Sequence, residues 1–139
     1  HFDNEYFPNF IEESDLEVRK WLSKYTYLKQ TKPRPEIYNV FDGRENFCEK
    51  NVVCLAELGD KVWKCLKEKD IISLGRLINR VHEAQKEMIP GYESDYAFKI
   101  LNGIKNNHMG TKLMGAGGYG YAMVLTKEPE KDFIKVSIT

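Results

Sequence analysis

The sequence predicts an α+β domain in which helices cover one face of an antiparallel sheet. Runs of apolar residues with helical spacing fill most of residues 47–105, and runs typical of strands follow between residues 112 and 139. Parallel neighbouring strands would require a crossover, usually a helix, between them, and no helical run separates these last strands. A doubly wound parallel fold is therefore disfavoured. Helices and strands that are segregated along a chain are typical of the α+β class.

The first part of the chain predicts one short helix and one strand. Residues 1–13 are aromatic and acidic without a clear period. Residues 14–17, Ser-Asp-Leu-Glu, fit a capping box with Ser14 as the N-cap, which predicts a helix over about residues 15–23. Residues 24–30 are rich in Tyr and Thr and predict a strand.

Three further helices are predicted from periodicity and capping residues. Residues 31–46 contain prolines and a glycine and predict a loop. Residues 47–67 carry apolar side chains at the spacing of an amphipathic helix. Asp70 is the expected N-cap of a second long helix, which Pro90-Gly91 ends, and Ser94 is the expected N-cap of a third.

The last third of the chain predicts strands joined by a glycine-rich loop and a turn. Residues 112–114 predict a short strand, and residues 119–126 predict a longer one. The glycines between them disfavour a regular element. Residues 127–131 predict a turn, and residues 133–139 alternate apolar and polar side chains as a half-buried strand does.

Charge and cysteine content narrow the functional classes. Lys plus Arg equals Asp plus Glu, 21 against 21, which gives no support for binding to nucleic acid or to an anionic membrane. A small anionic ligand remains compatible, because it requires only a local pocket. The three cysteines, Cys48, Cys54 and Cys65, show no metal-ligand spacing and predict small buried hydrophobes in a reducing, cytoplasmic compartment. Neither a membrane-spanning run nor a metal site is predicted.

The most informative segment is residues 112–125, which read KLMGAGGYGYAMVL. Four glycines within six residues permit positive φ angles and a close approach of backbone to backbone or to a ligand, and backbone amides in such a loop can face a phosphate. A strand follows and not a helix, so the segment is not a dinucleotide fingerprint, and it is not a Walker A loop. A tight glycine-rich hairpin without a ligand is the alternative interpretation.

This segment closely resembles the third conserved motif of the galactokinase–homoserine kinase–mevalonate kinase (GHMP) superfamily. The resemblance covers residues 44–126, and more loosely residues 21–139, and the sequence YLKQTKPRPEIYN at residues 27–39 is similar to a loop of sugar-kinase-like members. It implies that residues 1–22 are a connecting segment from a missing N-terminal domain. Residues 23–139 then form the C-terminal domain, with a ferredoxin-like two-layer fold.

The resemblance implies a two-domain kinase that transfers the γ-phosphoryl group of ATP to a sugar-like substrate. The missing N-terminal domain would bind most of the ATP and Mg²⁺, so this chain would contain no catalytic residue or metal ligand and would be inactive alone. Two departures from the motif are Tyr119, in place of a usual glycine, and Tyr121, in place of a frequent cysteine. The helix that many members place after Leu125 is also absent.

The resemblance implies that the loop residues that bind nucleotide and substrate are Gly115, Ala116, Gly117, Gly118 and Gly120. Tyr119 and Tyr121 are expected on one side of a strand, either as a wall against a ligand ring or as core residues.

Charged residues and histidines near the loop are weaker candidates. Arg34 and Lys112 are candidates for anion or sugar binding, each against the alternative of a solvated side chain. His82 is expected to be a satisfied or exposed helix histidine, and His108 is expected to face solvent. A non-catalytic module that binds a small ligand or a partner is the alternative function.

Overall fold

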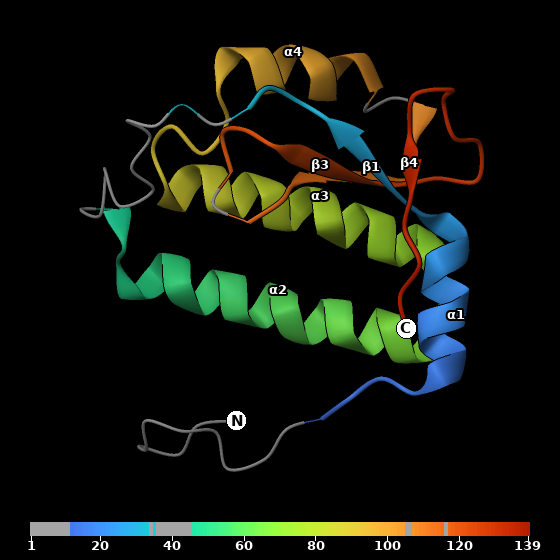
Figure 1. Ribbon diagram of the computed structural model, residues 1–139. Helices are drawn as coiled ribbons and strands as arrows, with labels where there is room; N and C mark the ends of the chain where they lie inside the picture. The colour runs from blue at the N-terminus through green and yellow to red at the C-terminus, as the bar shows by residue number, and fades with distance from the viewer. Residues whose placement is uncertain (1–11, 34, 36–45, 105–106, 116) are drawn as a thin grey trace.

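The computed structural model describes residues 12–33, 35, 46–104, 107–115 and 117–139. Two predicted site residues, Arg34 and Ala116, lie outside these ranges. The elements in chain order are α1 (Leu16–Tyr25), β1 (Thr26–Gln30), α2 (Glu49–Glu68), α3 (Ile71–Met88), α4 (Asp95–Ile104), β2 (Gly110–Leu113), β3 (Tyr121–Leu125) and β4 (Ile134–Lys135). Figure 1 shows their arrangement.

Side-chain caps fix where three of the helices begin. The carboxylate of Asp70 accepts hydrogen bonds from the first amides of α3, which confirms the predicted N-cap. The hydroxyl of Ser94 accepts from the amide of Ala97 at 3.2 Å and caps α4 as predicted. The prediction for α1 was wrong by one residue, because Asp15 and not Ser14 is the N-cap and accepts from the Val18 amide at 2.7 Å.

The four strands form one antiparallel sheet with the order β2-β3-β1-β4. This is the strand order of a ferredoxin-like fold, read from the opposite edge. Leu28 of the central strand β1 lies opposite Met123 on one side and Ile134 on the other. The predicted α+β class, with an antiparallel sheet packed against helices in a ferredoxin-like sandwich, is confirmed.

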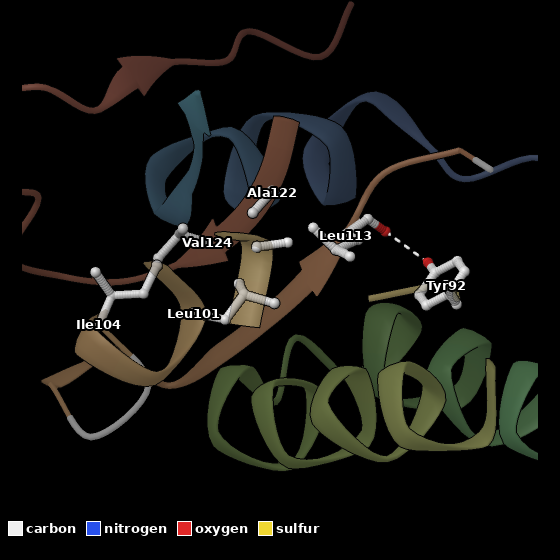
Figure 2. Packing of buried hydrophobic residues seen from close by; sticks show 7 residues of the cluster. Tyr92, Leu101, Ile104, Leu113, Ala122 and Val124 are labelled. Carbon is white, nitrogen blue, oxygen red and sulfur yellow. Dashed lines mark hydrogen bonds between the residues drawn. The ribbon is translucent and has the colours of Figure 1, made fainter. Parts of the chain in front are cut away.

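Successive residues of β3 pack against different helices, because side chains alternate between the two faces of a strand. Ala122 and Val124 are fully buried against α4, in a cluster with Leu101 that Figure 2 shows from close by. Leu125 points to the other face and packs against Leu74 and Ile78 of α3. Helix α3 therefore covers one face of the sheet, as predicted, and α4 covers the opposite face, which was not predicted.

Helix α3 approaches strand β2 with almost no side chain between them. Gly75 and Gly110 lie against each other, and a methyl group on either would collide with backbone atoms of the facing segment. Helix α2 packs along α3 and lies farther from the sheet (Figure 1). The pair of glycines therefore sets the closest distance between the helical layer and the edge of the sheet.

Residues 126–133 return from β3 to β4 without a helix, as the departure from the family pattern implied. His108 holds this segment: its Nδ1 lies 2.9 Å from the Thr126 hydroxyl, and its Nε2 lies 3.2 Å from Glu130. The side chain of His108 is only 3% exposed, so the prediction that it faces solvent was wrong.

The predicted burial of the cysteines was also wrong. Cys48 and Cys54 are exposed and Cys65 is half-buried, because all three lie on or beside α2, which covers α3 with only part of its circumference. Among the described helices, none combines the length and hydrophobicity needed to cross a membrane. The described residues also contain no cluster of His, Cys, Asp or Glu side chains suited to a metal ion.

Candidate functional site

The glycine-rich segment forms the connection between β2 and β3. Gly115, Gly117, Gly118 and Gly120 all have positive φ angles, between 56° and 89°, which ordinary side chains disfavour. Gly117 and Gly118 are buried, whereas Gly115 is exposed at the turn. A methyl group on Gly117 would collide with the ring and carbonyl oxygen of Tyr92, so the loop and Tyr92 fit together only because residue 117 has no side chain.

Backbone hydrogen bonds within the chain hold this loop. The amide of Gly117 donates to Met114 at 3.2 Å, and the amide of Gly118 donates to the Tyr92 carbonyl at 2.5 Å. The amide of Gly120 donates to the carbonyl of Lys32 at 2.8 Å, which ties the loop to the segment that follows β1. These amides are therefore not available to a phosphate in this conformation, and the loop has the character of a rigid support.

Tyr92 is the main anchor of the loop, and its role was not predicted from the sequence. Its side chain is buried, and its hydroxyl lies 2.9 Å from the carbonyl of Leu113 (Figure 2) and 2.7 Å from Oε1 of Gln85. The neighbouring Ser94, besides capping α4, donates its hydroxyl to the Gly118 carbonyl at 2.7 Å. The start of α4 and the loop are thus joined by both side-chain and backbone contacts.

Lys112 lies beside Tyr92, and its ammonium group is held by protein atoms. Its Nζ lies 2.9 Å from the carbonyl oxygen of Leu113 and 3.2 Å from the Tyr92 hydroxyl. Burial lowers the pKa of the Lys112 ammonium from its ordinary value. The alternative of a solvated lysine at a strand end therefore does not describe this side chain.

His82 forms a buried pair with Glu93 below the loop. Its Nε2 lies 2.6 Å from a carboxylate oxygen of Glu93, whose side chain is 8% exposed. Its Nδ1 receives a long contact of 3.5 Å from the Leu113 amide. An amide can only donate, so Nδ1 accepts and Nε2 carries the proton. Burial lowers the pKa of His82 although Glu93 opposes the change, which is consistent with a neutral, satisfied imidazole.

Two side chains of α3 satisfy the outer backbone groups of the edge strand β2. The amide of Thr111 donates to Oδ1 of Asn79 at 2.8 Å, and the amide of Leu113 faces His82. Asn79 and His82 are three residues apart and therefore lie on the same side of the helix. His82 is thus a structural side chain with both nitrogens engaged, and nothing in this geometry makes it a catalytic base.

The two tyrosines of the motif occupy different positions. Tyr119 precedes β3, in the bend that ends the loop, and is half-buried. Tyr121 is the first residue of β3 and is 40% exposed, so of the two alternatives the core position does not describe it. Tyr121 and Met114 are exposed side chains on paired segments at the base of the loop. They offer apolar surface beside the exposed Gly115.

Comparison with known proteins shows a distant similarity. No protein-family model matches the chain. The chain is 25% identical over 88 residues to the bifunctional fucokinase/GDP-fucose pyrophosphorylase of Arabidopsis thaliana. This alignment covers 63% of the chain and 8% of the plant protein, so the chain spans a small part of the length of this relative.

Proposed function

We propose that this chain is the C-terminal domain of an ATP-dependent kinase of the GHMP type, with a sugar or sugar phosphate as acceptor. The observation that carries the proposal is the KLMGAGGYG loop, which joins two strands of a ferredoxin-like sheet with four glycines at positive φ. The distant similarity to a protein named as a fucokinase and pyrophosphorylase supports the same class.

In this proposal the loop is a rigid wall of the cleft and not a cradle for phosphate. The amides of Gly117, Gly118 and Gly120 are already bonded to the chain, so the loop presents a fixed surface to its partner domain. Among the described residues, its exposed part consists of Gly115 with the neighbouring side chains Met114 and Tyr121. A preformed surface of this kind positions groups without a cost of ordering at each turnover.

The proposed reaction depends on parts outside this chain. Phosphoryl transfer requires a phosphate-binding loop, Mg²⁺ and a residue that positions the attacking hydroxyl, which the partner N-terminal domain would supply. Lys112 contributes to the wall through Tyr92, because its ammonium group is engaged with the Tyr92 hydroxyl and the Leu113 carbonyl. Arg34 and Ala116, which lie outside the described residues, are also proposed to contact the substrate.

A non-catalytic binding module is the second candidate, and one observation favours it. The amides of Gly117, Gly118 and Gly120 are bonded within the chain, which argues against a phosphate-binding role, whereas the exposed side chains of Met114 and Tyr121 offer apolar surface to a partner. The two candidates differ in what lies upstream of residue 1 in the gene. A segment of about one domain, roughly 100–200 residues, with a phosphate-loop motif supports the kinase, whereas a natural start near residue 1 supports the module.

An assay of two polypeptides tests the proposal. The chain alone and the chain extended by its encoded upstream domain are incubated with ATP, Mg²⁺ and a panel of monosaccharides and sugar phosphates. We expect ADP release with one class of acceptor from the extended protein and none from the chain alone. Phosphorylation by the chain alone, or no activity of a folded extended protein with any acceptor, would contradict the proposal.

A further inference from the structure

A groove between α2 and α3, away from the glycine-rich loop, has the features of a separate ligand site. It has a volume of about 440 Å³, within the range of roughly 300–1,000 Å³ common for small-molecule sites. Cys65 and Leu77 provide apolar surface in it. Its rim carries four exposed cationic side chains: Lys61, Lys64, Arg76 and Arg80.

The charges of this groove are only partly balanced. Two carboxylates also line it, so four cations against two anions leave a local excess of +2, whereas the whole chain is neutral. Glu68 lies 3.8 Å from Lys64. Asp70 accepts the first amides of α3, and hydrogen bonds from Ser73 together with the nearby charge of Arg76 lower its pKa.

Three of the four cations form no direct ion pair among the described residues, although the charge of Arg76 acts on the Asp70 carboxylate. Lys61, Arg76 and Arg80 form no ion pair with any other residue that the structure describes. A concave surface with charges of one sign concentrates the electrostatic field and attracts counter-ions. The groove is therefore electrostatically prepared for an anion.

We propose that this groove binds a soluble phosphorylated metabolite, whose phosphoryl oxygens are held by Arg76, Arg80 and Lys61. The two arginines are four residues apart on one face of α3, about 6 Å along the helix axis. Each presents a planar set of donors that matches phosphate oxygens. The body of the ligand lies on the apolar surface of Leu77 and Cys65. This site is independent of the proposed kinase function.

The surroundings of the groove favour a compact anion over a polyanion. The adjoining hollow between the same two helices is lined by Glu83 and Glu87, and it meets the cationic groove at Arg80. A nucleic acid backbone, or a long acidic peptide, would have to cross these carboxylates. A small phosphate ester fits within the cationic part alone.

Cys65 provides a direct reporter of occupancy. Its thiol lies in the groove, half-buried, and burial raises its pKa. Cys48 is exposed just before α2, 17 residues away, or about 25 Å along the helix. A ligand in the groove should cover Cys65 and leave Cys48 unchanged, so the two thiols form a test and an internal control in one molecule.

The experiment measures the alkylation rate of each cysteine by mass spectrometry after iodoacetamide treatment. The probe is inorganic pyrophosphate, compared with sodium chloride at equal ionic strength. We expect several-fold slower modification of Cys65 with pyrophosphate and no change at Cys48. The Arg76→Ala/Arg80→Ala variant should weaken the protection roughly tenfold, as loss of charge-assisted hydrogen bonds predicts.

Matched controls make each outcome decisive. The Lys20→Ala/Lys99→Ala variant removes two exposed cations outside the groove and should keep full protection, and circular dichroism checks that both double variants are folded. Equal protection by chloride, equal slowing at Cys48, or protection that survives loss of both arginines in a folded variant would overturn the proposal. Protection by phosphatidylserine vesicles but not by pyrophosphate would overturn the assignment to a soluble ligand.

Discussion

Replacement of Gly117 by alanine tests whether the glycine-rich loop is locked against Tyr92. Two costs arise at this position. A residue with a side chain at φ 73° is destabilised by about 1–2 kcal/mol. The new methyl group also collides with the Tyr92 ring and carbonyl, and overpacking of this kind costs about 1–3 kcal/mol. The expected loss of stability is therefore about 2–5 kcal/mol.

Gly115→Ala is the matched control for this substitution. Gly115 has a similar φ of 56°, but a methyl group there would meet no atom within 4 Å. Gly115→Ala should therefore lower the free energy of unfolding only by the cost of the positive φ angle, about 1–2 kcal/mol. The difference between the two variants isolates the contact with Tyr92.

Urea denaturation followed by circular dichroism measures both variants. Gly117→Ala should be the less stable by about 1–3 kcal/mol, and its melting temperature should be lower by roughly 3–5 °C for each kcal/mol. Equal stability of the two variants would refute the reasoning, because the loop would then not be packed on Tyr92 as described.

Three further predictions address the helices and the buried histidine. Gly75→Ala should lose at least about 2 kcal/mol in urea denaturation because its methyl group meets backbone atoms that cannot rotate away. Gly59→Ala, in open space on α2, should instead raise the free energy of unfolding by about 0.5–1 kcal/mol. A change of stability in the same direction for both variants would contradict the described packing of Gly75. The pKa of His82 is lowered in the folded chain, so just below pH 6.5 the imidazole takes up a proton in the unfolded chain but not in the folded chain. The free energy of unfolding should therefore fall as the pH drops below about 6.5. His82→Gln should remove that slope in melts at several pH values, and an unchanged slope would exclude His82 as its source. Asp15→Ala should cost about 1 kcal/mol and Ser14→Ala less than about 0.5, and the reverse order would restore Ser14 as the cap.

Local patterns predicted the helices well because each depends on nearby residues. The predicted helix over residues 47–67 is observed as Glu49–Glu68, since one apolar stripe is continuous along it. The last strand was overestimated for a non-local reason. The alternation continues to residue 139, but β4 ends at Lys135 and a last hydrogen bond joins the Val136 amide to the Thr26 carbonyl, because the residues before Thr26 belong to helix α1. Beyond that point the amide of Ile138 donates to Ser23 of α1.

The support of the candidate site could not be predicted, because it depends on contacts between distant residues. The motif identified the loop, but nothing near Tyr92 in the sequence indicates that it would lie under Gly117. Nothing near Gly75 in the sequence indicates that its backbone would lie against Gly110 either. One available signal was the Ser94 cap, which placed the start of a helix just after Tyr92.

The pairing of Asn79 and His82 with strand β2 has a consequence for how this domain can associate. Free N–H groups on a sheet border act as a template on which a strand from another chain can polymerise. Here two helical side chains occupy that template, and the opposite border, β4, has only two residues. Addition of a strand from another chain is therefore disfavoured at both borders of this sheet.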